Sequence, residues 1–439
     1  MFEKRYFDVV PKIVRAEHSA EIIIKGLVPH HDFRRCTDLK VSHVGGDGLT
    51  LGGTVPNWGF FAPIEEFKVA ADGGLTLVCQ FDGEGEHTIR IEGENNGRHF
   101  CRYFKIYALA ADLFNLRPFR GDCHVHTRYS ACSQGAEDPA YAAAVGRRLG
   151  LDFMALTDHC LYEPSLEAVA QIAKWPTYFK VFPGEEVHHV DLPNLHFVNF
   201  GGKASVNAMI RQNEAADFRS EVAAMAKNFP VCRDIEEQKL MAASSWIFKK
   251  IHEVGGLAVF CHPMWHPVER FNLPSAVCKN IYDRMEFDAV ELIGSGMTPD
   301  RRESTQLNVS FYYQQCIEKG RLIPVVGDTD SHWCERQLLH SQTIAFAKDN
   351  SYEEICRAIR GCRSVAGEFI SGEFPHIYGN PRLVSFAYFL NREYFPEHDE
   401  LCAAEGEIMI AALMDGAEGE KLAQYSDLNE RLFSKYYQR

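Results

Sequence analysis

Over residues 1 to about 115, apolar and polar positions alternate in short runs, which is the pattern of strands that bury one face. Clear examples are GLTLVCQF, EHTIRIEG and RHFCRYFKIYAL, which are separated by glycine-rich clusters such as ADGG and GENNG. Short strands with such turns are typical of a sandwich-type domain. We therefore expect residues 1–115 to form a β-sandwich-like domain, and its scattered histidines to be surface or core residues: His18, His30, His31, His43, His87 and His99.

From Arg117 onward, the pattern changes to apolar runs that alternate with longer helical stretches. Seven runs are expected to be strands: GDCHVHT, DFMALTD, KVFPGEE, HFVNFG, GLAVFCH, FDAVELI and LIPVVGDTD. Helices are expected at 138–149, 164–174, 218–228, 236–253 and 310–319. This alternation is typical of a parallel sheet, and seven such strands predict a closed or nearly closed α/β barrel over residues 116–370. Residues 371–439 are expected to form a helical C-terminal extension.

Composition and charge narrow the class of protein further. Of the 439 residues, 46% are hydrophobic and 24% are charged, as in globular proteins. The formal charge of -14 argues against a general nucleic-acid surface or an anionic membrane partner. No apolar run reaches the ~18 residues of a membrane span, and the charged start MFEKRYFDVVPKIV does not resemble a secretory signal. We expect a cytoplasmic protein whose 14 cysteines are reduced.

The residues that could carry chemistry lie where the expected strands end. In an α/β barrel, the C-terminal ends of the strands converge on one face. Residues i and i+2 of a strand share a side, so His124 and His126 can bind one ion as a pair. Imidazole and carboxylate groups are ligands for divalent transition metals. They recur at successive strand ends, which predicts a metal centre: His124, His126, Asp158, His159, Glu185, Glu186, His196, His262, Glu291, Asp328, Asp330 and His332.

These residues also carry a resemblance to a known family. GDCHVHTRYS, ALTDH, PGEEV followed by NLHFVNFGG, FCHP and VVGDTDSH resemble, in order and spacing, the successive motifs of the PHP (polymerase and histidinol phosphatase) superfamily. The match covers about residues 120–335, and the preceding LFNLRPFRGDCHVHT is similar to longer members with a β domain ahead of the barrel. The resemblance implies a metal-dependent phosphoesterase with a distorted (β/α)7 barrel and two or three divalent ions (Zn, Mn or Fe).

The resemblance also implies which residues bind each ion. A first ion would be held by four side chains: His124, His126, Glu186 and Asp330. Glu186, which matches the Gly-x-Glu step of the family where Glu185 does not, would bridge to a second ion. That second ion would be completed by two further imidazoles, those of His196 and His262.

A third ion would be bound by His159 and His332. At this point the sequence departs from the family pattern, because Ser130-Ala131-Cys132 stands where relatives commonly supply an Asp or His beyond the Ser. Two ligands are fewer than the three or more that hold a zinc ion well. We therefore expect the third site to be weak, or to use the Cys132 thiolate.

Catalysis would follow from the ions, since two of them can generate a bridging hydroxide and neutralise the phosphoryl oxygens. Arg128 is the candidate for positioning a phosphate. Asp158 fits a role in orienting the ligands, and His188 could act as a general acid or face solvent. Cys123 and Cys261 are expected to point to the opposite side of their strands, into the core.

Three functions remain open from the sequence. The first is a phosphoesterase that hydrolyses a small phosphorylated metabolite or nucleotide. The second is an amidohydrolase-like metal-dependent hydrolase, a class that also uses His-x-His on a barrel. The third is a non-catalytic, metal-stabilised module whose β domain binds a partner such as a sugar chain. The combination of ALTDH, Gly-x-Glu and Asp-x-His favours the first.

Overall fold

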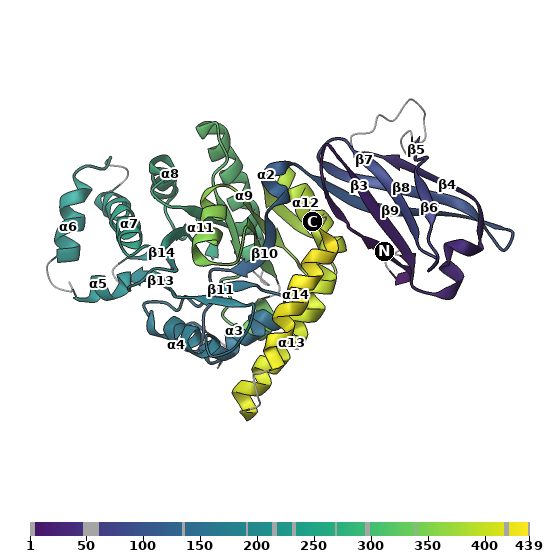
Figure 1. Cartoon of the computed structure of the whole chain (residues 1–439). Coiled ribbons are helices and arrows are strands. Elements are labelled where there is room, and N and C mark those ends of the chain that lie inside the picture. Colours follow the sequence, from purple (N-terminus) through teal and green to yellow (C-terminus); the bar gives the residue numbers. More distant parts are fainter. Residues whose placement is uncertain are drawn as a thin grey trace. The chain divides into compact units, whose positions relative to one another are not determined.

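The computed structural model of the chain is shown in Figure 1. It describes residues 5–46, 61–133, 137–189, 192–212, 217–230, 234–267, 270–294, 299–338, 340–416 and 421–437. Contacts between residues divide the chain into two units. The first, here called the β unit, comprises Met1–Leu116, Ser385–His398 and Asp427–Arg439. The second, here called the α/β unit, comprises Arg117–Val384 and Asp399–Ser426.

The β unit contains two sheets that share one hydrophobic core. One sheet has the order β1 (Phe7–Val10), β3 (His18–Gly26), β7 (Leu75–Phe81), β6 (Phe67–Val69). The other has the order β2 (Ile13–Arg15), β9 (Arg98–Leu109), β8 (Gly85–Asn95), β4 (Cys36–Val44), β5 (Ala62–Pro63). Along β7 and β8 every second residue is buried, because successive side chains of a strand point to opposite faces.

The longest hairpin of the β unit joins β8 and β9 through a two-residue turn. The turn residues Asn96 and Gly97 have φ values of 52° and 70°. Asn and Gly tolerate this left-handed conformation best, and it matches the twist of the paired strands. Two short 3-10 helices, Pro29–His31 and Phe33–Arg35, connect β3 to β4.

The α/β unit contains two further sheets. The six-stranded sheet has the order β12 (Lys180–Phe182), β11 (Phe153–Ala155), β10 (Arg117–Asp122), β18 (Ser341–Ala347), β19 (Ser364–Glu368), β20 (His376–Gly379). The five-stranded sheet has the order β13 (Gly184–His189), β14 (Leu192–Phe200), β15 (Leu257–Phe260), β16 (Ala289–Gly294), β17 (Val325–Asp328). Strands β15 and β17 are buried throughout, as their continuous apolar runs require.

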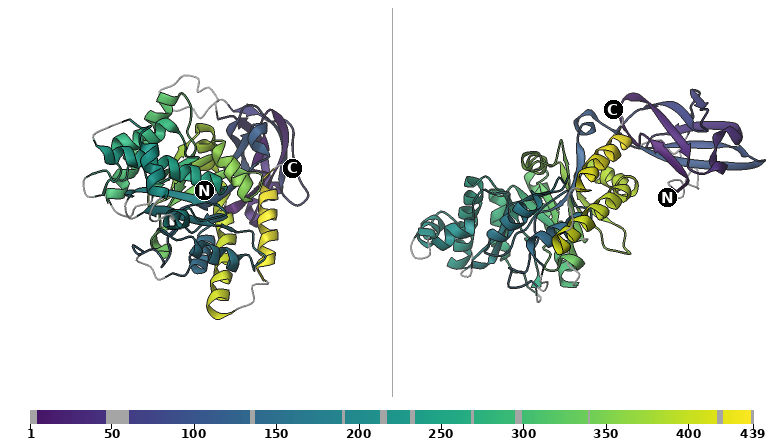
Figure 2. Two further views of the ribbon diagram at one scale, coloured as in Figure 1. Left: turned by 90° about the vertical axis from the view of Figure 1, so that its left-hand side faces the viewer. Right: turned by 60° about the horizontal axis from the view of Figure 1, so that its bottom comes forward.

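Helices flank these sheets, as Figures 1 and 2 show. Those near the expected positions are α3 (Pro139–Arg148), α4 (Glu163–Ile172), α6 (Asp217–Ala226), α7 (Ile235–Glu253) and α9 (Pro299–Lys319). Further helices of the chain are α2 (Ala111–Phe114), α5 (Val206–Gln212), α8 (Ser275–Arg284), α10 (Cys334–Gln337), α11 (Tyr352–Arg360), α12 (Pro381–Glu393), α13 (Phe395–Asp415) and α14 (Leu422–Tyr436). Of these, α2 and parts of α12, α13 and α14 belong to the β unit. Within the described residues, the helices are too short or too polar to cross a membrane.

The strand pairings among the described residues do not close a barrel, so the structure shows a mixed α/β unit with two sheets. Isolated parallel bridges, Val125 with Ser331 and His159 with Glu186, connect strand ends of the two sheets. The expected all-parallel arrangement is also wrong in part. Strand β14 runs antiparallel to β13 and β15, because β13 and β14 follow one another without an intervening helix.

Candidate metal centre

The ends of β10 and β17 bring the His-x-His pair and Asp330 together. His124 and His126 follow β10, and both are buried. Their Nε2 atoms lie 3.2 Å apart, and Asp330 Oδ1 lies 3.4 Å from the first and 3.0 Å from the second. Val125, between them, points away into a hydrophobic cluster shared with α3. The ligand atoms of these three polar side chains are close enough to share one metal ion.

Two buried carboxyl groups tie these strand ends to each other. Asp122 at the end of β10 accepts hydrogen bonds from Thr329 N and Thr329 Oγ1 at 3.2 and 2.6 Å. Asp328 at the end of β17 accepts one from Cys123 N at 2.9 Å. Burial raises the pKa of Asp122 to about 7 and also raises that of Asp328. The reciprocal bonds fix the spacing between the His-x-His segment and the loop after β17.

Glu186 on β13 lies between two groups of imidazoles. Its side chain is fully buried. Oε1 lies 2.6 Å from His196 Nδ1 and 3.8 Å from His262 Nε2. Oε2 lies 2.7 Å from His159 Nδ1 and 3.3 Å from both Nε2 atoms of the His-x-His pair. One carboxylate therefore directs an oxygen to each group.

The surroundings of Glu186 Oε2 fit a bound cation. This buried oxygen makes no hydrogen bond of acceptable geometry, although three imidazole nitrogens surround it. A buried carboxylate oxygen without a hydrogen bond is costly, and a neutral nitrogen lone pair cannot satisfy it. A divalent ion accepts electron pairs from both, and mixed nitrogen and oxygen ligands suit zinc, manganese or iron. The buried His, Asp, Glu and Cys groups of this region can thus bind metal ions.

Other residues orient the imidazoles from behind. Glu291 on β16 has Oε2 at 2.7 Å from His124 Nδ1. Ser130 Oγ donates to Asp158 Oδ1 at 2.7 Å and lies 2.9 Å from His126 Nδ1, from which it can accept a hydrogen bond. A hydrogen bond at Nδ1 fixes the tautomer and leaves the Nε2 lone pair for a metal. Both rings of the His-x-His pair are held in this way.

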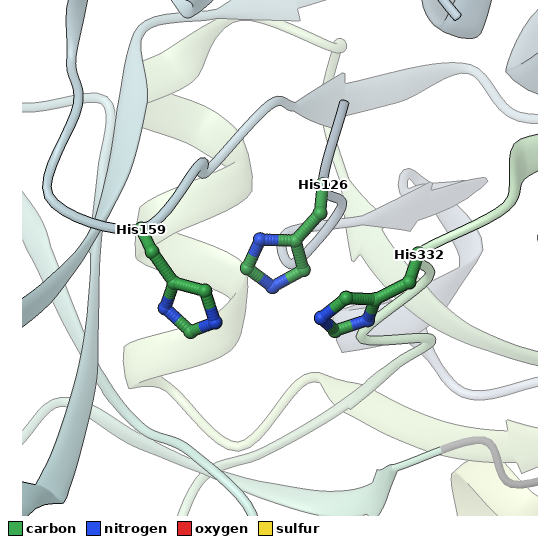
Figure 3. A group of neighbouring side chains, drawn as sticks. All are labelled: His126, His159 and His332. Atoms are coloured by element: carbon green, nitrogen blue, oxygen red, sulfur yellow. The ribbon is translucent and has the colours of Figure 1, made fainter. Parts of the chain in front are cut away.

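A further group of imidazoles lies beside the first. The rings of His126, His159 and His332 come from three different strand ends and point toward one another (Figure 3). Their ligand atoms lie within 4.8 Å of one another. Cys132 Sγ lies 3.1 Å from His332 Nε2, and His188 Nδ1 lies 3.3 Å from His159 Nδ1. The sulfur of Cys132 is therefore at the edge of the expected third site.

The charges of the site favour a cation. Burial lowers the pKa of His126 to about 3. Burial also acts to lower the pKa of His159, but Glu186 and Cys132 outweigh it and raise that pKa to about 11. Burial also acts to lower the pKa of His124, but nearby groups, with Glu186 the largest contributor, outweigh it and raise that pKa. Burial thus keeps the His126 ring neutral, as a metal ligand must be, while Glu186 favours positive charge beside His124 and His159, which a divalent ion would supply.

Arg128 lies in the loop between β10 and α3. Its guanidinium forms an ion pair with Asp138 at 2.7 Å and stacks over the ring of Tyr129. Almost half of the Arg128 side chain is exposed. Its expected contact with a phosphate would require the Asp138 pair to open.

Glu185 faces the opposite side of β13 from Glu186. It accepts hydrogen bonds from Val206 N at 2.5 Å, Ser205 Oγ at 2.7 Å and Asn207 Nδ2 at 3.0 Å. These bonds hold the first turn of α5 against the strand. The two adjacent carboxylates thus have different environments.

The sequence analysis missed two features of this region. Ser130, which connects Asp158 to the His126 ring, carries no signal in the sequence beyond its place after the His-x-His motif. The expectation that Cys261 faces away from the site is wrong, because its sulfur lies within 4.8 Å of ligand atoms of His124 and Glu186. Cys261 continues the alternation of β15, because it packs in the same cluster as Leu257 and Val259, and this face of the strand reaches the site. The alternation ends one residue later, at His262, which has a φ of 26°.

One small cavity adjoins the site, and a larger one has none of the candidate ligands among the described residues of its wall. A cavity of about 20 Å³, enough for one water molecule, is lined by His262, Trp265 and Asp330. A larger one of about 880 Å³ lies beside α3 and α4 and includes Trp333, the neighbour of His332, in its wall. The larger cavity has room for a metabolite.

No protein-family model matches this chain. No curated protein matches it either. Among solved structures, an amidohydrolase from Chromobacterium violaceum with bound sulfate and no metal is 18% identical, with 48% of this chain and 87% of that chain covered and a TM-score of 0.30. The lesion-specific endonuclease PfuEndoQ from Pyrococcus furiosus is 16% identical, with 60% of this chain and 58% of that chain covered and a TM-score of 0.31. Likenesses of this size carry no argument about function.

Proposed function

We propose that the protein is a metal-dependent phosphoesterase with a PHP-type (β/α)7 site, acting on a small phosphorylated metabolite or nucleotide. The position of Glu186 is the observation that carries the proposal. Its two oxygens face separate groups of imidazoles, and one of them is buried without a hydrogen bond. Two cations bound to this carboxylate would account for both of its oxygens and for the imidazoles of His124, His126, His196 and His262.

The proposed ligand sets are those that the resemblance implies, and the short distances among His124, His126 and Asp330 support the first of them. One ion would be bound by His124, His126, Glu186 and Asp330, and a second by Glu186, His196 and His262. A third would use His159 and His332, with Cys132 as a candidate ligand. Divalent ions at such a site activate water and neutralise the charge on phosphoryl oxygens.

The remaining roles belong to side chains around the ligands. Glu291 and the Ser130–Asp158 pair hold the ring nitrogens of the His-x-His pair toward the ions. His188, beside His159, is our candidate for moving a proton to the leaving group. Arg128 would bind the substrate phosphate after release from Asp138.

Metal analysis and a hydrolysis screen test the proposal together. The full chain, purified without chelator and reloaded with manganese, zinc or iron, should hold at least two ions. It should hydrolyse phosphomonoesters or phosphodiesters and leave amides intact. Fewer than one ion per chain would contradict the metal centre itself. Hydrolysis of amides alone would favour an amidohydrolase reaction at the same centre.

A further inference from the structure

The β unit contains a cavity of about 610 Å³ at the end of the β8–β9 hairpin. Its wall combines strand β1, the segment of short 3-10 helices between β3 and β4, and the first residues of β9. These segments are far apart in sequence and meet only in the fold. A cavity of this size suits a metabolite rather than a single ion.

The described residues of the cavity wall include cations but no Asp or Glu. Arg98 and Arg102 lie on β9, an even number of residues apart, so they share a face of the strand. His31 is in the wall, and burial, together with the positive charges of His30 and Arg102, lowers its pKa. A local excess of positive charge is notable in a chain with a formal charge of -14.

The same wall carries apolar rings and an amide. Phe100 lies between the two arginines on β9, and the ring of Phe7 lies 4.7 Å from that of His31. Asn95 Nδ2 donates to His30 O at 2.9 Å, and its Oδ1 is buried without a hydrogen-bond partner. An unsatisfied buried acceptor is costly unless a donor reaches it. The wall can therefore receive an anion and an apolar face, and the exposed amide of Asn96 can bond to polar groups.

We propose that this cavity binds a sugar phosphate. Two guanidinium groups match the charge of about -1.5 to -2 that a phosphate monoester carries at neutral pH. A carboxylate carries a single negative charge and so matches the charge of one of the two guanidinium groups. The hydroxyl groups of a sugar can bond to the exposed amide of Asn96, and the C–H face of the sugar packs on the phenylalanine rings. This site is independent of the metal centre and of the reaction proposed there.

Calorimetric titration of the full chain tests the assignment, with ribose 5-phosphate as the probe. Because the metal centre also would bind phosphates, the titration is done after chelation with EDTA and in the Glu186→Gln variant. We expect one binding site per chain under both conditions. Arg98→Ala should weaken binding about tenfold, since it removes charge-assisted hydrogen bonds at an exposed position that the fold does not need.

Arg15→Ala provides the matched control, because Arg15 is an exposed arginine of the same unit at the end of β2. It should leave binding unchanged. Inorganic phosphate and glucuronate form separate arms and should bind at least tenfold more weakly than the sugar phosphate. Hydrogen exchange supplies a second readout, with slower exchange expected at the tip of the β8–β9 hairpin when the probe is bound.

Several results would overturn the proposal. They are the absence of binding, equal binding by Arg98→Ala and the parent, and equal binding of glucuronate and ribose 5-phosphate. Binding that disappears with EDTA or in Glu186→Gln would assign the probe to the metal centre alone. Conversely, a chain without metal or hydrolytic activity that still binds the probe would contradict the proposed function and leave this site intact.

Discussion

Glu185 and Glu186 are neighbours in sequence with different tasks. Glu186 faces the imidazoles, whereas Glu185 accepts hydrogen bonds from the start of α5. We expect Glu186→Gln to lose at least one metal ion and most activity, because an amide cannot bridge two cations. Glu185→Gln should keep its metal and lose about 1–3 kcal/mol of unfolding free energy, since its amide nitrogen would face donors.

These two variants are controls for one another. Metal content by elemental analysis and unfolding free energy by denaturant titration separate the effects. Loss of metal from folded Glu185→Gln, with metal retained in Glu186→Gln, would mean that the carboxylates have been assigned in the wrong order.

Ser130 tests whether the orientation of an imidazole matters for metal affinity. Its hydroxyl lies between Asp158 and His126 Nδ1, so Ser130→Ala leaves that ring without its partner. We expect manganese or zinc affinity to fall by a factor of roughly 10–100 in competition with a chelating dye. Ser244→Ala removes another buried hydroxyl, which bonds only within α7 at Leu240 O, and should leave the affinity unchanged. Equal affinities for the two variants would contradict an orienting role.

At the scale of elements, β4 and β8 share a pair of histidines. His43 Nε2 lies 2.9 Å from His87 Nδ1. Burial, reinforced by His87 and opposed by Asp82, lowers the pKa of His43 to about 4. Since this pKa is below the ordinary value of 6.5, the unfolded chain binds more protons between pH 6.5 and 4. The free energy of unfolding should therefore fall, by about 2 kcal/mol from this residue, as the pH is lowered through that window.

Comparison of pH profiles isolates this contribution. Unfolding of the full chain by denaturant at several pH values should show a shallower decline below pH 6.5 in His43→Gln than in the parent. His18→Gln replaces an exposed histidine on β3 and should keep the parental decline. A His43→Gln profile parallel to that of the parent would show that the pair does not affect stability in this range.

At the scale of the whole molecule, the β unit includes segments from the C-terminal end of the chain. The Tyr107 ring packs against Phe386 and Phe389 of α12, at 4.8 and 5.2 Å between ring centroids. Lys12 pairs with Glu393 at 2.5 Å. A chain that begins at Arg117 should keep its metal ions but lose solubility, because these aromatic residues of α12 lose their partners.

A matched truncation distinguishes the two effects. Deleting Asp427–Arg439 as well removes part of the segment that packs in the β unit, including the buried Tyr436 and Phe433. Both truncated chains should bind the same number of ions as the full chain, measured on fractions that melt cooperatively. A truncated chain that melts cooperatively but binds no metal would show that the β unit contributes to the metal centre.

Local pattern was enough to predict the features that depend on neighbouring residues. Alternation along runs such as EHTIRIEG indicated strands with one buried face, because side chains of a strand alternate between faces. Amphipathic stretches indicated the positions of α3, α4 and α7. Ligand-type residues at successive strand ends, from His124 to His332, indicated a metal centre, because parallel strands end on a common edge.

Which groups distant in sequence lie close together depends on the packing of the folded chain. Strand order, the antiparallel placement of β14 and the inclusion of Ser385–His398 in the β unit depend on pairing between segments far apart in sequence. The sulfur of Cys261 lies near ligand atoms of His124 and Glu186 because the face of β15 that carries Leu257 and Val259 meets the ends of other strands there. The cavity with Arg98 in its wall likewise forms from segments with no common motif. Contacts of this kind follow from packing of the whole chain, which no local pattern encodes.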